Sequence, residues 1–400
     1  MIRMLTAGES HGKSLTLILD GFPAGVPVTA EKINARLSER QKGYGRGGRM
    51  KIEQDQAEIL SGIRYGKTIG SPISLLIRNN DWLNHQDMMS IDPIDNPEKR
   101  ITVPRPGHAD YTGAVKYGFT DIRNSIERSS ARETAARVAA GAIAEQLLDA
   151  FGITVSGLVE SIGGIYALND VYERFCDTGI IEYDVSQVER SPLRVVDEAQ
   201  ENAIIGLVRK IKKSGDTLGG TFITYAKGVP AGLGSFMQYD RRLDAALTKA
   251  VMSINAVKAV EIGLGFAAAS RPGSLAHDGF SIDAAQQITR TSNRAGGIEG
   301  GISNGMPLLI RAAMKPIATL MQPLPSVDLA TMELVESRRE RSDFLAVPSC
   351  SVIAEAMVRW VLAEFMTEKF TGDSLHEMKR NYLAYKNEMM KPMREPDVEN

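Results

Sequence analysis

Residues 14–25, Ser-Leu-Thr-Leu-Ile-Leu-Asp-Gly-Phe-Pro-Ala-Gly, run from a short apolar segment into a turn rich in glycine and proline. The same arrangement returns at residues 221–232, Thr-Phe-Ile-Thr-Tyr-Ala-Lys-Gly-Val-Pro-Ala-Gly. Such segments are typical of β-strands that end in turns. Helical patterns follow both, over residues 30–40 and 241–257. The sequence therefore predicts two structural units that share an order of strand, turn and helix.

Two more matches extend this parallel. Residues 70–78 resemble residues 305–311, and Arg128-Ser129 resembles Arg341-Ser342, where each dipeptide precedes a long predicted helix. Because these matches are short, an internal duplication is a hypothesis rather than a conclusion. Within a single domain of residues 1–400, the halves would span about 1–200 and about 201–390, and a site would lie where they meet. The tail, about 391–400, is expected to be flexible, as chain ends commonly are.

Residues 130–152 carry the best-marked helix of the chain. Ser130 followed by Glu133 is a capping box, and Gly152 is a typical helix end. Alanines on the apolar face predict close packing against another element. The positive end of the helix dipole lies next to Arg132, which favours an anion there. A second long helix is predicted over about 349–370.

The composition describes a soluble globular protein of one large or two average domains, with 400 residues, 43% hydrophobic and 24% charged. No run approaches the roughly 20 apolar residues of a membrane helix, and the start is too short for a signal peptide, so we expect a cytoplasmic location. A net charge of −2 gives no basic field for nucleic acid. Cys176 and Cys350 form neither a disulfide framework nor a metal-binding spacing. We expect both to be reduced, Cys350 buried at a helix start, and no metal centre.

Two of the five histidines, His11 and His108, lie in glycine-containing loop sequences, residues 8–12 and 105–110. Arginine-rich segments lie between and after them, and these arginines are positioned to gather around a multiply charged anion. A neutral imidazole beside fixed guanidinium charges predicts proton transfer on an anionic substrate. The remaining three, His85, His277 and His376, are predicted to be surface residues.

Two short motifs suggest other classes of protein. Residues 7–14 fit a loose P-loop pattern of a nucleotide triphosphatase, but the next segment reads as a strand rather than the required helix. Residues 44–49 resemble an RNA-binding arginine–glycine tract, but in a single copy. A mobile active-site loop in which Arg46 and Arg49 bind phosphate or carboxylate fits residues 44–49 better. Residues 293–301, dense in glycine, and the segment from 315 to 319 are typical of the edge of a cofactor pocket.

Four segments read together resemble the chorismate synthase family: residues 8–12, 105–110, 128–135 and 341–343. The resemblance covers nearly the whole chain in the right order. It implies an α+β fold in which a helical layer lies between two antiparallel sheets, assembled as a homotetramer. It also implies the anti 1,4-elimination of phosphate from 5-enolpyruvylshikimate 3-phosphate to chorismate, which requires reduced FMN (FMNH2) without net redox change. Two sources of the reduced flavin stay open: the chain itself reduces FMN with NADPH, or a separate flavin reductase supplies it.

The resemblance also implies roles for individual residues. His11 matches a histidine that protonates the departing phosphate, His108 one that protonates the reduced flavin, and Asp343 an aspartate that helps the flavin accept a proton. Positions matched to substrate or NADP binding are Arg40, Arg46, Arg49 and Arg132. Positions matched to FMN binding are Arg128, Ser129, Ser130, Asn255, Ala256, Gly300, Lys315, Pro316, Ile317, Ala318, Thr319 and Arg341. The family often has histidine at position 342 and glutamine at position 255, where this chain has serine and asparagine.

Overall fold

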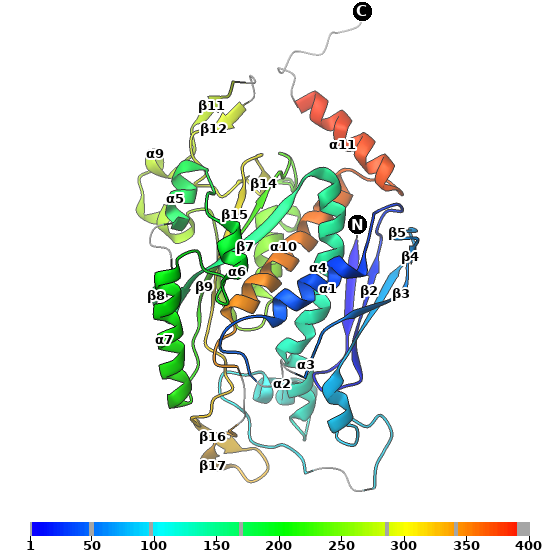
Figure 1. The fold of residues 1–400 in the computed structure, drawn as a ribbon, viewed down its shortest axis with the longest axis vertical. Coiled ribbons are helices and arrows are strands. Elements are labelled where there is room, and N and C mark those ends of the chain that lie inside the picture. Colours follow the sequence, from blue (N-terminus) through cyan, green and yellow to red (C-terminus); the bar gives the residue numbers. More distant parts are fainter. Residues whose placement is uncertain are drawn as a thin grey trace, which may run out of the picture.

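The computed structural model describes residues 2–47, 52–95, 99–167, 171–284, 288–339 and 343–389. Figure 1 shows a group of helices with a sheet on either side. All strand pairs in both sheets are antiparallel. The predicted α+β class, with a helical layer between two antiparallel sheets, is confirmed. Within the described ranges, none of the helices has the length and apolar character needed to span a membrane.

The first sheet has the strand order β1-β2-β6-β3. Its strands are β1 (Arg3–Ala7), β2 (Ser14–Asp20), β6 (Ile73–Arg78) and β3 (Ala57–Ser61). In β2 every second residue is buried, and Leu15, Leu17 and Leu19 are each at most 1% exposed. This alternation places one face of the sheet on the core, as a strand with one covered face requires.

The second sheet has the strand order β10-β15-β9-β7-β8. Its strands are β10 (Val257–Ile262), β15 (Leu308–Met314), β9 (Gly220–Lys227), β7 (Thr154–Ile162) and β8 (Ile165–Tyr166). The centre of β9 is buried on both faces. The long helices cover one face, and a second apolar cluster that includes Tyr172 and Phe175 covers the other.

The helical layer between the sheets contains α1 (Ala30–Gln41), α4 (Thr134–Leu148), α8 (Leu243–Met252) and α10 (Val347–Lys369). A Cβ atom on Gly141 of α4 would lie 2.5 Å from Cα of Ala356 in α10. The two helices therefore cross closely enough to exclude a side chain at Gly141, as the alanine-rich face predicted. Cys350 is buried in the first turn of α10 and, like Cys176, is a free thiol, as predicted.

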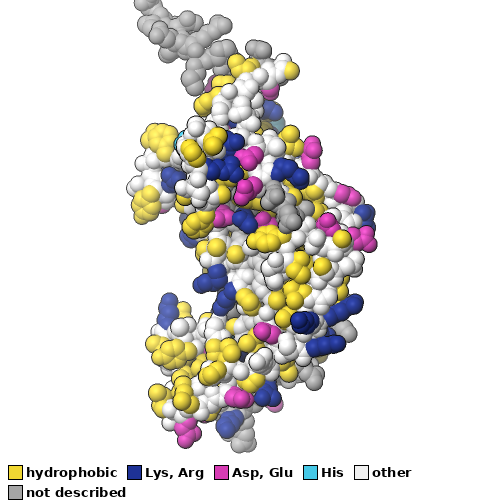
Figure 2. All heavy atoms as spheres, turned by 90° about the vertical axis from the view of Figure 1, so that its left-hand side faces the viewer, with side chains coloured by type: hydrophobic (Ala, Val, Ile, Leu, Met, Phe, Trp, Pro, Cys, Tyr) yellow, Lys and Arg dark blue, Asp and Glu magenta, His cyan; other side chains and the backbone are white. Residues whose placement is uncertain are grey.

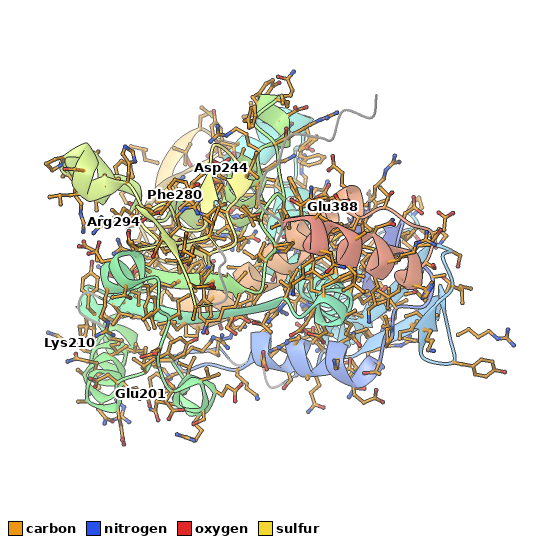
Figure 3. All side chains as sticks on the ribbon, turned by 90° about the horizontal axis from the view of Figure 1, so that it is seen from above. Glu201, Lys210, Asp244, Phe280, Arg294 and Glu388 are labelled. Carbon is orange, nitrogen blue, oxygen red and sulfur yellow. The ribbon has the colours of Figure 1, made fainter. Side chains whose placement is uncertain are left out.

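The remaining elements lie around this frame. The helices are α2 (Asp110–Tyr117), α3 (Arg123–Ser129), α5 (Val171–Thr178), α6 (Val185–Arg190), α7 (Glu198–Ser214), α9 (Gly273–Ala276) and α11 (Leu375–Met389). The short hairpins are β4–β5 (Ile63–Arg64, Lys67–Thr68), β11–β12 (Phe280–Ile282, Ile288–Arg290), β13–β14 (Ile298–Glu299, Ile302–Ser303) and β16–β17 (Pro325–Asp328, Glu333–Glu336). Seen from above in Figure 3, α7 with Glu201 and Lys210 lies on the opposite side of the molecule from Glu388 of α11.

One predicted capping box and one predicted helix end were wrong. Ser130 does not form a capping box with Glu133: its Oγ accepts from the backbone N–H of Arg132 and caps a 3₁₀ turn, while Glu133 pairs with Arg137. The helix predicted over 241–257 ends at Met252, because the chain turns into β10 through a left-handed residue, Ala256, with a φ of +67°. The other predicted elements lie within a few residues of the observed ones.

The order of elements repeats along the chain. We propose that the two sheets and their helices arose by an internal duplication, in which β1-β2-α1-β3-β6-α4 corresponds to β7-β9-α8-β10-β15-α10. The first four strands have the order β1-β2-β6-β3, and their counterparts have the order β7-β9-β15-β10. The boundary between the halves then falls near Gly152, ahead of β7, rather than near residue 200. The tail beyond residue 389 lies outside the described residues.

Candidate active site

The loop between β1 and β2 holds His11 against α3. Gly8 enters this loop with a φ of +106°, and a Cβ atom there would lie 2.3 Å from the carbonyl oxygen of Ser14. Glycine is therefore required for so tight a connection. The backbone N–H of Ser10 donates to the carbonyl of Glu127 at 3.1 Å, which fixes the loop on α3.

Glu127 is the direct partner of His11. Its carboxylate lies 2.8 Å from Nδ1 of His11 and also accepts the backbone N–H of His11 at 2.8 Å. Burial raises the pKa of Glu127, but the hydrogen bonds and charge of His11 outweigh this and lower the pKa below its ordinary value. Because Glu127 is ionised and can only accept, the proton of the imidazole lies on Nδ1. This leaves Nε2 of His11 for proton transfer.

A buried ion-pair network supports the same loop. Arg40 donates to Asp55 at 2.8 Å, and Arg132 pairs with the other oxygen of Asp55. Arg132 also donates to Oδ1 of Asn79 at 2.8 Å, and the amide of Asn79 donates to the carbonyl of Gly12 at 2.7 Å. Burial raises the pKa of Asp55, but the two guanidinium groups overcome this and lower it. The charged groups of Arg40, Arg132 and Asp55 therefore hold Asn79 in place, and Asn79 in turn holds the His11 loop through Gly12.

Arg46 and Asp343 form a second pair. Arg46 lies 2.8 Å from Oδ2 of Asp343, and the backbone N–H of Gly47 donates to Oδ1 at 2.5 Å. The loop after α1 is thus joined to the segment before α10. Arg49 and Arg341, which the sequence also marked, lie outside the described residues.

His108 has its own carboxylate at the start of α2. Its Nδ1 lies 2.5 Å from Oδ1 of Asp110, which is fully buried. Arg105 donates to the same carboxylate at 2.9 Å and to Oγ1 of Thr319 at 3.0 Å. Burial raises the pKa of Asp110, but His108 and Arg105 hold it far below its ordinary value. The imidazole is therefore fixed by an ionised carboxylate, in the same manner as His11.

Hydrogen bonds connect the two histidine loops through the residues predicted to hold FMN. Ser10 donates to Ser130 at 3.1 Å, and Asn255 donates to the carbonyl of Ser129 at 2.9 Å. The backbone N–H of Lys315 donates to the carbonyl of Ala256 at 2.9 Å. Nζ of Lys315 then donates to the carbonyl of Gly107, next to His108, at 2.5 Å. Five of the predicted cofactor residues, Ser129, Ser130, Asn255, Ala256 and Lys315, therefore connect the two histidine loops.

The structure brings most of the marked residues together but separates Gly300 from them. Gly300 lies in the turn between β13 and β14, where Gly301 accepts the backbone N–H of Leu243 at the start of α8, whereas Asn255 follows the other end of that helix. Arg36 pairs with Glu145 of α4 at 2.5 Å and does not join the network around Asp55.

Sequence reasoning missed some neighbours of His11. His85, predicted to be a surface residue, lies with its ring centroid 4.4 Å from that of His11, and only 28% of its side chain is exposed. Glu127 and Asp81 also reach His11 from distant segments. In the sequence, Glu127 could have been noticed only because it directly precedes the Arg128-Ser129 segment that was matched to FMN binding.

The P-loop interpretation of residues 7–14 fails on geometry. This segment joins β1 to β2, which pair with each other in antiparallel register. A P-loop requires a helix after the loop, whose N-terminus binds phosphate.

Two imidazoles held by ionised carboxylates, with guanidinium groups around them, are the kind of arrangement that enzymes use to move protons on anionic substrates. The family model for chorismate synthase matches residues 2–367. The chain is 52% identical over 393 residues to the chorismate synthase of Pelobacter propionicus, with 96% of this chain and 98% of the relative covered. It is 51% identical to the chorismate synthase of Chlorobaculum tepidum, with the same coverage.

A solved structure described as a chorismate synthase has a TM-score of 0.78 to this chain at 41% identity, and the match covers 97% of this chain and 98% of that one. The chain belongs to the chorismate synthase family. It is accordingly a carbon–oxygen lyase that acts on phosphates.

Proposed function

We propose that this chain converts 5-enolpyruvylshikimate 3-phosphate into chorismate by anti 1,4-elimination of phosphate, the last step of the shikimate pathway to aromatic amino acids. The observation that carries the proposal is the series of hydrogen bonds that joins the loop of His11 to the loop of His108, from Ser10 to Ser130, from Asn255 to Ser129, and from Lys315 to Ala256 and Gly107. Two proton-transferring groups thus flank one region of polar side chains. The substrate has two carboxylates and a phosphate, which explains the local concentration of arginines in a chain of net charge −2.

His11 is suited to protonate the departing phosphate. Glu127 fixes the ring through Nδ1, so Nε2 is the nitrogen that delivers the proton. A carboxylate that holds an imidazole in this way also stabilises its protonated form, as the aspartate of a serine protease triad does. Arg40 and Arg132 are paired with Asp55 inside the protein, and Arg132 lies 3.6 Å from Glu53, so we propose that these guanidinium groups act chiefly by holding the His11 loop in place beside the phosphate.

The residues around Asn255 fit a flavin. Oδ1 of Asn255 is buried without a hydrogen-bond partner among the described residues, so it can accept from a ligand. Ser129, Ser130, Lys315 and Thr319 add hydroxyl and ammonium donors of the kind that hold an FMN phosphate and ring. When bound here, reduced FMN would supply electron density to the allylic system of the substrate. The region thus fits the group that the proposed reaction requires.

His108 and Asp343 are the groups that handle protons next to this region. Asp110 and Arg105 fix His108, which can then deliver a proton at the flavin. Arg46 and the backbone of Gly47 fix the carboxylate of Asp343, which can assist the removal of a proton. Both are held rigidly, which reduces the entropic cost of reaching a reactive geometry.

We also propose that the flavin arrives reduced from a separate reductase. Arg40 and Arg46, two of the four positions matched to substrate or NADP binding, are both paired with carboxylates of the protein. Oxidation of NADPH by the purified chain with FMN, at a rate equal to product formation, would contradict this and make NADPH the direct reductant.

A homotetramer in the cytoplasm completes the proposal. Figure 2 shows hydrophobic side chains gathered at the lower end of one face, where Figure 1 places the β16–β17 hairpin. Met332 and Leu334 of that hairpin are 75% and 86% exposed, and Phe280 of the β11–β12 hairpin is 71% exposed. Exposed apolar groups of this kind are typical of interaction surfaces. The mass from light scattering should equal four chains.

The test of the lyase activity is anaerobic incubation of the protein with 5-enolpyruvylshikimate 3-phosphate and chemically reduced FMN. The absorbance of the chorismate diene and the released phosphate are followed together. Equal amounts of both support the elimination. Phosphate without diene would identify a phosphatase, and no product from folded, flavin-binding protein would contradict the proposal.

A further inference from the structure

Three side chains with metal-binding atoms converge beside the His11 loop. Nε2 of His11 lies 3.9 Å from Oδ2 of Asp81, and Nε2 of His85 lies 3.8 Å from the same oxygen. One ligand atom from each of the three residues lies within 4.8 Å of the others. Their side chains are 24%, 13% and 28% exposed, so a hydrated ion can reach them.

The fold fixes these residues in place. Ser14 of β2 pairs with Arg78 of β6, so the loop before β2 meets the chain after β6. The backbone N–H of Asn79 donates to the carbonyl of Lys13 at 3.2 Å, which locks this meeting point. The 3₁₀ helix η2 (Asn80–Asn84) follows, and His85 is its C-cap residue. Asp81 and His85 therefore lie on one short rigid turn, opposite His11.

Outer hydrogen bonds orient the ligand atoms. Glu127 holds Nδ1 of His11, so Nε2 is directed toward Asp81. The amide of Asn84 donates to Oδ1 of Asp81 at 3.0 Å, on the oxygen that does not face the histidines. A carboxylate behind an imidazole is the arrangement that supports metal-binding histidines in known metal sites.

We propose that His11, Asp81 and His85 form a binding site for a transition-metal ion of the Zn²⁺ class. Two imidazoles and one carboxylate suit Zn²⁺ and Co²⁺, whereas Mg²⁺ and Ca²⁺ require oxygen ligands. Around a tetrahedral Zn²⁺ with bonds of about 2.0–2.1 Å, ligand atoms lie roughly 3.3–3.5 Å apart. Reaching this range from separations of up to 4.8 Å requires side-chain rotation, chiefly of His85, whose side chain is 28% exposed. The fourth position stays open for water or a phosphate oxygen.

A bound metal ion would compete with the transferred proton for Nε2 of His11. An ion on Nε2 of His11 occupies the electron pair that otherwise holds the transferred proton, so bound Zn²⁺ inhibits turnover. This consequence rests on the proposed role of His11, whereas metal binding itself does not. Sequence patterns did not predict the site, because its ligands come from two segments about 70 residues apart in the chain and the two cysteines take no part.

The test is a titration of the purified full chain with Co²⁺ alone, followed by its visible d–d absorption, and with Zn²⁺ alone, followed by calorimetry. The wild-type chain should bind one ion per chain. His85→Gln should weaken binding by more than the roughly 10–100-fold that loss of an outer partner costs, and Asp81→Asn should do the same. His376→Gln is the matched control, because it removes an exposed histidine of α11, and it should bind like wild type.

Two results would overturn the site. The first is that Co²⁺ gives no d–d absorption bands with the wild-type chain, and the second is that His85→Gln and Asp81→Asn both bind the ion as tightly as wild type. Activity provides a separate readout. Zn²⁺ should inhibit wild type and His376→Gln, and His85→Gln should retain turnover at the Zn²⁺ concentration that stops them. One bound ion without inhibition would support the site and contradict the role of His11 in the elimination.

Discussion

Glu127→Gln is the change that probes the histidine–carboxylate pair most sharply. Glu127 accepts two hydrogen bonds from His11, one at Nδ1 and one from its backbone N–H, both at 2.8 Å. A glutamine amide accepts through its oxygen only and donates through its nitrogen, so one of these two donors loses its acceptor. A hydrogen bond to a charged group contributes about 1.5–3 kcal/mol. If that loss falls on proton transfer, kcat decreases roughly 10- to 150-fold.

The assay is steady-state turnover with saturating reduced FMN, followed by the chorismate diene under anaerobic conditions. KM should change little, because Glu127 is 3% exposed and acts on substrate through His11. Glu133→Gln is the matched control: this carboxylate lies on the neighbouring turn, pairs with Arg137 at 3.0 Å, and should leave kcat unchanged. A kcat for Glu127→Gln within about twofold of wild type would refute the positioning role.

Three further outcomes are expected. His108→Ala should lower kcat by about 10²–10⁴, and turnover close to wild type with reduced FMN would remove His108 from the proton-transfer set. Gly141→Ala forces a methyl group against Ala356, 2.5 Å from the ideal Cβ position, and should cost about 1–3 kcal/mol of unfolding free energy; a melting temperature equal to wild type would contradict the close helix crossing. The carboxyls of Asp55 and Asp110 have lowered pKa values when folded, so they stabilise the protein above the ordinary value of 3.8 and lose this as the pH falls through their folded values. Denaturant unfolding at decreasing pH should therefore show falling stability below about pH 4 in wild type and a weaker fall in Asp55→Asn.

Local patterns predicted the strands and helices well because their causes are local. The apolar run in residues 14–19 and the alanine-rich face after Ser130 are properties of neighbouring residues. The end of α8 was missed because Ala256 adopts a left-handed conformation that its residue type does not indicate. Ser130 is a cap as predicted, but Glu133 does not complete a capping box, because Ser130 caps a 3₁₀ turn that precedes α4.

The sequence marked residue types for a candidate site, but it could not indicate how these residues pair. Loop context and the family resemblance marked His11 and His108, and the structure places both beside carboxylates. Glu127 lies 116 positions from His11, so no periodicity or spacing connects them. His85 looked like an ordinary surface histidine because its neighbours in sequence are polar, and only the pairing of β2 with β6 brings it to His11.

The most direct test of the account is anaerobic turnover with far less reduced FMN than substrate, in the absence of any other reductant. Diene, phosphate and the redox state of the flavin are measured in the same sample. Because the elimination has no net redox change, each flavin should support many turnovers, with equal diene and phosphate, and should still be reduced at the end. Product limited to one equivalent per flavin, with the flavin oxidised, would contradict the proposed chemistry.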